Sequence, residues 1–185
     1  MSAATHEDVI TVLTEQHERI RSLLDETRQA VGEARRDHFA QLRRFLAVHE
    51  TAEEMVVHPR SREGTGGSEI ADALLAEEHA AKQILADLDG MSVADDSFAP
   101  RLAELRAAVL SHAEHEEREE FPILRETADE KTLVTMARAV RAAEAIAPTH
   151  PHPGVESATA NVLVGPIASV IDRARDAVRA VWPGP

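Results

Sequence analysis

Hydrophobic residues recur at alternating intervals of three and four positions along most of this 185-residue chain, which is the spacing of one face of an α-helix. Such stripes predict four long helices, over about residues 7–31, 37–58, 68–88 and 99–127. In the second stretch the stripe consists of Phe39, Leu42, Leu46, His49, Glu53 and Val56. In the third it is less regular and consists of Leu74, Leu75, His79, Leu85 and Leu88. Histidine and glutamate thus occupy positions at which a helix normally carries core residues.

Turn-forming residues separate these helices. They lie at residues 32–33, in a glycine-rich segment at 63–67 and at residues 95–96. Ala, Leu, Glu and Arg are abundant, which favours helices, and aromatic residues make up only 3% of the chain, which is poor for a β-sandwich. The sequence therefore predicts an all-α fold in which residues 1–127 form an antiparallel up-down four-helix bundle.

Four histidines and two glutamates on these stripes form one unit that is used twice. The first unit is His17, His49 and Glu53, followed by Pro59, and the second is His79, His112 and Glu116, followed by Pro122. The second unit follows the first by 62 residues at its first histidine and by 63 at each later position. If the chain folds back at the turns, all four histidines reach one level of the bundle, about 24 Å from the turns.

A metal site explains why these polar residues occupy inward positions. An ionised glutamate in a bundle core costs several kcal/mol unless another charge compensates it, and a buried imidazole also needs a partner. Two metal ions would balance the acids, with about three protein ligands per ion and the carboxylates as bridges. Cysteine is absent. A site of imidazole and carboxylate without thiolate suits iron or manganese, with zinc as a further option.

The order His, His-x-x-x-Glu, His, His-x-x-x-Glu, with a proline six residues after each glutamate, resembles the hemerythrin-like, or HHE cation-binding, family over roughly residues 5–127. The resemblance implies a four-helix bundle that holds two iron ions in a non-haem centre with oxygen-derived bridges. It also implies terminal imidazole ligands and bridging carboxylates. The imidazoles would come from His17, His49, His79 and His112, and the carboxylates from Glu53 and Glu116.

The chain departs from the oxygen-carrying members of that family at two places. Those members carry a second histidine four residues after the third-helix ligand, where this chain has Gln83, and an aspartate five residues after the last histidine, where it has Glu117. Loss of one imidazole makes the site more symmetric and more open, which disfavours reversible oxygen transport. The resemblance implies instead a protein that binds or reacts with oxygen, hydrogen peroxide or nitric oxide in stress defence, with catalase-like peroxide decomposition as the candidate enzymatic activity.

Two other classes of function stay open: a non-enzymatic iron or oxygen sensor, and a redox-inert zinc-binding bundle. A ferritin-like site is excluded because none of the ten histidines has a glutamate three residues before it. A zinc protease motif is excluded because Glu53 stands where its second histidine would be. Glu50 is a candidate supplementary ligand, as in some family members. His58, His115 and Glu119 are expected to lie at the surface or to support the ligands.

Net charge limits the range of partners. The formal charge is -13, the pI is near 5.2, and every group of Lys and Arg has acidic neighbours, so nucleic acid and anionic membranes are not expected partners. The first ten residues lack both a basic start and an apolar run, and no stretch of about 18 apolar residues occurs. We therefore expect a soluble, cytoplasmic protein whose ligand is a diatomic molecule or peroxide.

Residues 128–185 are predicted to form a helical extension. Residues 131–146 are amphipathic, residues 148–154 form a Pro/His-rich connector, and residues 155–182 carry a second apolar pattern. The apolar face of this extension is too large to remain exposed, so we expect it to pack on the bundle. The alternatives are that the C-terminal helices form a homodimer or hold a partner.

Overall fold

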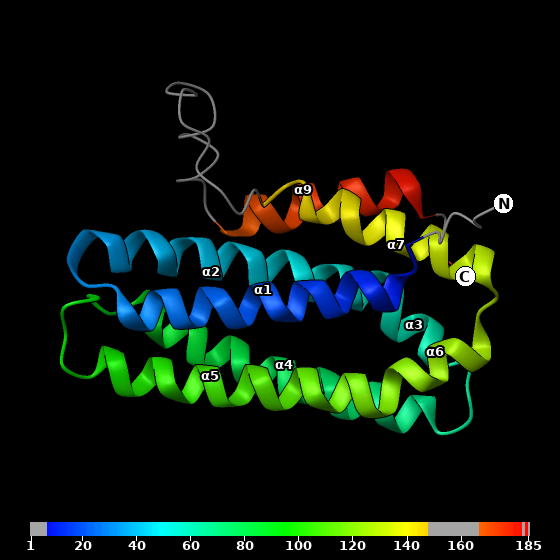
Figure 1. Ribbon diagram of the computed structural model, residues 1–185, viewed down its shortest axis with the longest axis horizontal. Helices are drawn as coiled ribbons and strands as arrows, with labels where there is room; N and C mark the ends of the chain where they lie inside the picture. The colour runs from blue at the N-terminus through cyan, green and yellow to red at the C-terminus, as the bar shows by residue number, and fades with distance from the viewer. Residues whose placement is uncertain (1–6, 148–166, 183, 185) are drawn as a thin grey trace, which may run out of the picture.

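The computed structural model describes residues 7–147, 167–182 and 184, and every regular element within them is a helix. The prediction of an all-α fold is therefore confirmed. Four long helices form the bundle (Figure 1): α1 Val9–Gln29, α2 Gly32–Ala52, α4 Gly67–Asp89 and α5 Phe98–His115. These bounds lie close to the predicted stretches, except that α2 begins at Gly32, within the predicted turn, and not at residue 37.

Two of the long helices continue through a wider turn into a short helix. The π-helical segment η1 Glu53–Val57 connects α2 to α3 His58–Ser61, and η2 Glu116–Glu120 connects α5 to α6 Phe121–Thr127. The backbone N–H of His58 bonds to the carbonyl of Glu53, and that of Phe121 bonds to the carbonyl of Glu116, in each case five residues back.

The prolines that follow give the physical reason for these wide turns. Pro59 and Pro122 lie in helical segments that continue to Ser61 and Thr127. Proline lacks an N–H and its ring collides with the carbonyl four residues earlier in a regular α-helix. A π-helical turn just before the proline is one way for a helix to accommodate the proline ring, and such turns are frequent at functional sites.

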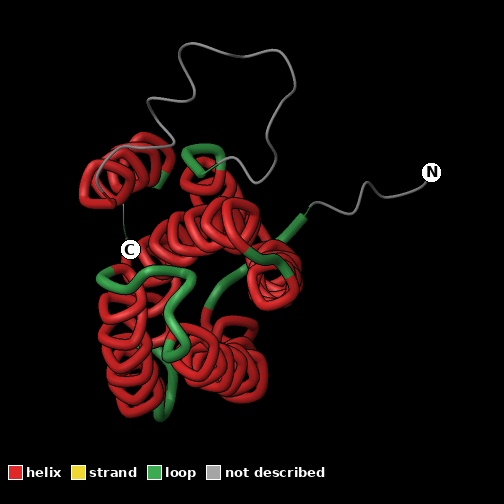
Figure 2. The backbone as a smooth tube through the Cα atoms, turned by 90° about the vertical axis from the view of Figure 1, so that its left-hand side faces the viewer, coloured by secondary structure: helices red, strands yellow, loops and turns green. Residues whose placement is uncertain are grey.

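The helices stack in three layers of two, which the end-on view in Figure 2 shows clearly. One outer layer is α4 and α5, the middle layer is α1 and α2, and the other outer layer is α7 Glu130–Glu144 and α9 Ile167–Val181. The buried face of α9 consists of Val170, Ala174 and Val178. This packing confirms that the described part of the extension covers its apolar face on the bundle. The connector at 148–154 and residues 155–166 lie outside the described residues.

Two hydrophobic clusters divide the core along the bundle. The first includes Leu13 and extends into the α7–α9 layer through residues such as Met136. The second includes Ile20 and Phe98 and fills the half of the bundle near the α1–α2 turn. His17 lies on α1 between Leu13 of one cluster and Ile20 of the other. A layer of polar side chains therefore separates two dry halves of the core.

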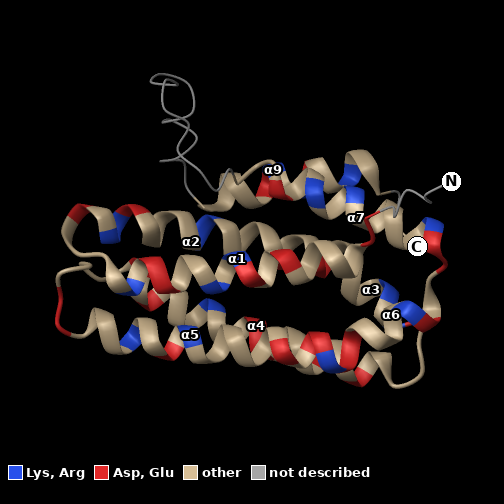
Figure 3. Cartoon of the chain, viewed as in Figure 1, with Lys and Arg blue, Asp and Glu red and all other residues tan. Residues whose placement is uncertain are grey.

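Charged side chains are distributed along the outer faces of the helices. In the view of Figure 3, Lys and Arg are interspersed with Asp and Glu along the described helices and do not gather into one basic face. Exposed ion pairs of this kind typically contribute less than about 1 kcal/mol each, so the stability of the fold depends mainly on its interior. Among the helices described here, none is both long and apolar enough to cross a membrane.

The start of α4 is fixed by an unusually close contact. A Cβ atom on Gly67 would lie 1.8 Å from the carbonyl oxygen of Ser61 at the end of α3. Only glycine allows this approach, because any side chain would have to displace the backbone of the preceding turn. The contact determines where α4 leaves α3, and it contributes to the rotation of α4 about its own axis.

Gly67→Ala is expected to destabilise the protein, because the added methyl group would overlap Ser61. Overpacking of this kind costs about 1–3 kcal/mol, which for a chain of this length lowers the Tm by roughly 2–12 °C. Differential scanning calorimetry measures the change. Gly90→Ala is the control, because its nearest new contact would be an ordinary 3.5 Å and its φ of -80° suits alanine. An unchanged Tm for Gly67→Ala would contradict the close contact.

Candidate metal centre

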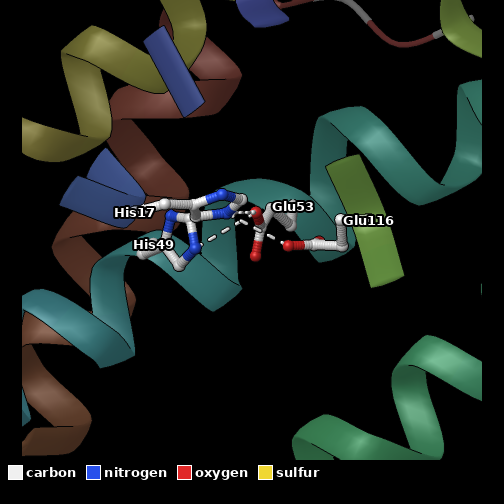
Figure 4. A group of neighbouring side chains, drawn as sticks. All are labelled: His17, His49, Glu53 and Glu116. Carbon is white, nitrogen blue, oxygen red and sulfur yellow. Dashed lines mark ion pairs between the residues drawn. The ribbon is translucent and has the colours of Figure 1, made fainter. Parts of the chain in front are cut away.

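Four of the six predicted ligands meet in the polar layer between the two hydrophobic clusters (Figure 4). His17 comes from α1, His49 from the last turn of α2, and Glu53 and Glu116 from the first positions of η1 and η2. One ligand atom from each of these residues lies within 4.8 Å of the others. The Nε2 of His49 is 3.2 Å from Oε1 of Glu53, and the Nε2 of His17 is 3.1 Å from Oε2 of Glu116.

His112 joins the same centre from α5. Its Nε2 lies 3.6 Å from Oε1 of Glu116. It also forms a second group of potential ligands with Glu53 and Glu78, whose ligand atoms again lie within 4.8 Å of one another. The two groups share Glu53, so the centre has two adjacent halves joined by a common carboxylate.

Six polar atoms at this centre have no hydrogen-bond partner among the described residues. They are Nε2 of His17, Nε2 of His112 and both carboxylate oxygens of Glu53 and of Glu116. The short contacts between them are ion-pair distances without hydrogen-bond geometry. All four side chains are buried. Because buried polar groups are normally satisfied, a group of unpaired acceptors at one point indicates that a cation completes them.

The other nitrogen of each inward histidine is held from outside the centre. The contacts are Nδ1 of His17 with Glu117 at 2.8 Å, Nδ1 of His49 with Gln16 at 2.9 Å, and Nδ1 of His112 with Glu77 at 3.1 Å. Each partner atom is a carboxylate or amide oxygen that accepts, so Nδ1 donates and the lone pair of a neutral ring lies on Nε2, toward the centre. Metal-binding histidines typically have this arrangement.

His79, the sixth predicted ligand, is not brought to this centre. It lies on the exposed face of α4, where its Nε2 is 2.9 Å from the side-chain nitrogen of Gln83. The preceding residue, Glu78, is buried and faces the centre instead. The structure therefore corrects the prediction that α4 supplies His79 as a ligand.

The hydrophobic frame of α4 gives the physical reason for this correction. The stripe residues that flank His17 on α1 are repeated 61 residues later as Leu74 and Ala81, whereas His79 follows His17 by 62 residues. Leu74 and Ala81 are both buried. Their packing sets the rotation of α4, so the side chain that corresponds to His17 in this frame is Glu78. The offset of 61 was the sequence signal that could have identified it.

A buried ionic network adjoins the centre. His58 contacts Oε1 of Glu120 through Nδ1 at 2.8 Å and Oε1 of Glu78 through Nε2 at 2.7 Å. Ionised carboxylates only accept, so both ring nitrogens donate and His58 is an imidazolium. Lys82 donates to the other oxygen of Glu78 at 3.0 Å. His58 is therefore a buried supporting residue, one of the two roles that the sequence indicated for it.

The π-helical turn of η2 explains why Glu120 was missed. A regular α-helical spacing from His112 and Glu116 would place Glu119 on the inward side, but a π-helical turn accommodates an extra residue and moves the following positions by one. Glu120 is accordingly buried, whereas Glu119 is partly exposed and lies 3.4 Å from His115. His115 also contacts Glu77, the residue that holds His112. It is thus a supporting residue, as expected.

Burial and mutual charge set the protonation of the ligands. Burial, assisted by the nearby His17, lowers the pKa of His49 to about 3, so this imidazole is neutral and able to bind a metal. Burial acts to raise the pKa of Glu116, but the imidazoles of His112 and His17 outweigh it and lower this pKa to about 2. Burial and the charge of Glu116 raise the pKa of Glu53 well above its usual value. A cation between the two carboxylates would relieve this repulsion.

Two further groups hold protons at neutral pH. Burial raises the pKa of Glu50 to about 8, against the opposing charge of Lys82. The hydrogen bonds with Glu120 and Glu78 overcome the cost of burial and raise the pKa of His58 to about 10. Glu50, the candidate supplementary ligand, borders the same cavity as His49. It belongs to none of the metal-binding groups found among the described residues.

The donor set fits a pair of metal ions. Five buried glutamates lie at or beside this level: Glu50, Glu53, Glu78, Glu116 and Glu120. The positive charges of His58 and Lys82 offset two of the five, so three negative charges would need protons or cations. Imidazole and carboxylate ligands without thiolate suit iron, manganese or zinc. Fold and site together define a helical bundle that binds cations in its interior.

Comparison with known proteins identifies the family. The family model of the hemerythrin HHE cation binding domain matches residues 8–124, which is more than half of the chain. The chain therefore belongs to the hemerythrin HHE cation-binding family, as its sequence resemblance implied. A crystal structure of a hemerythrin HHE cation binding domain-containing protein from Mycobacterium kansasii superposes with a TM-score of 0.71 at 16% identity, covering 90% of this chain and 99% of that one. At this identity the likeness concerns the fold.

A curated relative covers the chain less fully. A protein named DNA nickase from Nostoc sp. (strain PCC 7120) is 25% identical over 134 residues, which are 72% of this chain and 38% of that protein. This chain thus corresponds to less than half of the length of that relative.

The metal-free protein is expected to lose stability as the pH rises from 6.5 to 8. Over this range folded His58 and Glu50 retain protons, with pKa values of about 10 and about 8, whereas the unfolded chain has released them at the usual 6.5 and 4.5. Each such group lowers the free energy of unfolding by up to about 1.4 kcal/mol per pH unit. Thermal unfolding in the presence of a chelator measures the slope.

Glu50→Gln provides the control for this pH dependence. The variant lacks the proton retained by Glu50, so its stability should fall less steeply between pH 6.5 and 8, with the His58 contribution left in place. A wild-type stability that is constant or rises over this interval would contradict the assigned protonation of these two residues.

Proposed function

We propose that this chain is a non-haem di-iron protein that binds or reacts with oxygen, hydrogen peroxide or nitric oxide in the response to oxidative or nitrosative stress. The observation that carries the proposal is the set of six unpaired buried ligand atoms on His17, His112, Glu53 and Glu116. Family membership supports a cation at this position. Iron is proposed over zinc and manganese because the family resemblance implies it.

The residues of the centre would divide the work of holding two ions. His17 and His49 would bind one ion and His112 the other. Glu53 belongs to both groups and Oε1 of Glu116 lies 3.6 Å from Nε2 of His112, so both halves could share these two carboxylates. When bound, iron supplies redox chemistry, because it exchanges electrons with a small molecule at an open coordination position. The protein contributes fixed imidazoles, held by Glu117, Gln16 and Glu77, and a dry setting above and below the polar layer.

The space beside these ligands supports a very small partner. A cavity of about 10 Å³ is lined by polar groups of the centre, including His49 and Glu50, and by apolar side chains such as Ile20 and Val109. A volume of this size is about that needed for one water molecule. A ligand of two or a few atoms, such as a diatomic gas or peroxide, suits it better than an organic substrate.

A sensor and a zinc-binding protein remain as secondary proposals. A non-enzymatic sensor would use the same centre and report metal or oxygen occupancy to a partner, and a zinc form would be redox-inert. The C-terminal homodimer stays a prediction, and Val170, Ala174 and Val178 of α9 are already buried within this chain. A cytoplasmic location also stays a prediction. Nucleic acid is outside the proposal, since the net charge is -13.

Removing both shared carboxylates tests the metal centre. Glu53→Ala combined with Glu116→Ala is expected to abolish iron binding, because each half of the centre loses its common oxygen ligands. Metal analysis and visible absorption after reconstitution measure the outcome: about two irons and a coloured product for the unmodified chain, and neither for the variant. Glu114→Ala is the matched control, since Glu114 is exposed on α5. Unchanged iron content in the double variant would overturn the proposal, and zinc in a colourless native protein would favour the redox-inert form.

Peroxide consumption separates enzyme from sensor. The iron-loaded chain is expected to consume hydrogen peroxide in large molar excess over protein, with evolution of oxygen measured by an oxygen electrode. Consumption that stops near one equivalent per centre would favour a sensor. The iron-loaded Glu114→Ala protein is again the control and should match the unmodified chain.

A further inference from the structure

The inward face of α4 is a regular stripe that contains a single acidic residue. Its buried residues are Gly67, Ala71, Leu74, Glu78, Ala81 and Leu88. Glu78 therefore takes a core position one turn after Leu74 and one turn before Ala81. His79 lies about 100° further around the helix, on the exposed side.

Rotation of α4 to bring His79 inward would be unfavourable. The residues that share the side of His79 at helical spacing include Asp72 and Lys82, which would then move toward the core, while Leu74 and Leu88 would move toward solvent. Burial of unpaired charges and exposure of leucines both oppose this rotation.

Glu78 is within reach of unpaired ligand atoms. Its carboxylate, a Glu53 oxygen and a His112 nitrogen all lie within 4.8 Å of one another. Both oxygens of Glu53 and Nε2 of His112 lack hydrogen-bond partners among the described residues. Glu53 and His112 thus present unpaired ligand atoms close to the carboxylate of Glu78.

Two hydrogen bonds hold the carboxylate of Glu78 in place and leave it able to bind a further partner. Oε1 is 2.7 Å from Nε2 of His58 and Oε2 is 3.0 Å from Nζ of Lys82. Each carboxylate oxygen has two lone pairs, so one on each oxygen remains for a further partner. His58 is itself fixed by Glu120. His58 and Lys82 act as positioning residues that orient Glu78 from outside the centre.

We propose that Glu78 is the metal ligand supplied by α4, so that the centre has one imidazole-rich half and one carboxylate-rich half. This inference rests on the proposed function, in that it assumes a two-metal centre. The first half consists of His17 and His49 and the second of His112 and Glu78. Glu53 belongs to both groups, and Glu116 would be shared through its position 3.6 Å from Nε2 of His112. Carboxylate ligands favour harder cations and imidazole favours iron and zinc. The second half therefore accepts manganese more readily than the first.

Adjacent substitutions test the assignment. Glu78→Gln and His79→Gln change neighbouring residues on α4, and each keeps a polar side chain of similar size. After anaerobic reconstitution with iron and removal of loose metal, we expect His79→Gln to retain about two irons and Glu78→Gln about one. When iron and manganese are supplied together, the unmodified chain and His79→Gln should take up both metals, and Glu78→Gln should lose mainly manganese.

A measurement on the unmodified chain covers the case in which Glu78→Gln does not fold. Cobalt(II) binding is expected to give large contact shifts to the ring protons of His17, His49 and His112 in proton NMR, and none to those of His79. The His79→Gln spectrum assigns the His79 signals. A contact-shifted His79 ring, or loss of a metal ion in His79→Gln, would overturn the inference.

The outcomes distinguish this inference from the proposed function. If folded Glu78→Gln keeps two metal ions while Glu53→Ala with Glu116→Ala keeps none, Glu78 is not a ligand and the two-metal centre stands. If the double variant also keeps two metal ions, the centre itself is misplaced and both proposals fail.

Discussion

Buried carboxylates are the constraint on which the rest of this structure depends. Five glutamates lie in or beside one layer of the bundle, with hydrophobic clusters on both sides of it. His58 and Lys82 offset two of these charges, and the remainder need protons or cations. An uncompensated buried charge costs several kcal/mol, so the protein is fully stable only when this layer is neutralised. Metal binding and folding are therefore coupled through the same side chains.

A glutamate followed six residues later by a proline occurs in both halves of the bundle, and this repeat shapes the polar layer. In both halves of the bundle a buried glutamate, Glu53 or Glu116, begins a π-helical turn, and a proline follows six residues later. The wider turn moves the following residues by one position around the helix. It thereby directs His58 and Glu120 inward, where they contact each other and support Glu78. The prolines thus shape the buried network beside the ligands without ending their helices.

Some features of the fold and of the centre could be predicted from the sequence, and others could not. His17, His49, Glu53, His112 and Glu116 could be predicted because they lie on long, regular stripes between clear turns. The rotation of α4 could not be predicted from histidines alone, since it is set by Leu74 and Ala81, which follow the corresponding α1 residues by 61 positions and not by 62. The inward turn of Glu120 required knowledge of a π-helical segment, which hydrophobic spacing does not reveal. The apolar faces of the described C-terminal helices predicted that they pack on the bundle. They did not predict that α7 and α9 form a separate outer layer.

The α7 helix connects the C-terminal extension to the centre through Gln16 of α1. His49 Nδ1 is 2.9 Å from Oε1 of Gln16, and the amide nitrogen of Gln16 donates to Glu144 of α7 at 3.2 Å. Arg141, also on α7, fixes Glu144 at 2.7 Å. Because an amide must point its oxygen at a donor and its nitrogen at an acceptor, Gln16 can satisfy both neighbours in only one orientation. The orientation of a central imidazole therefore depends on where α7 packs, and a displacement of either one strains the hydrogen bonds of the other. The extension is in this sense part of the support of the centre as well as a cover for the apolar face of the bundle.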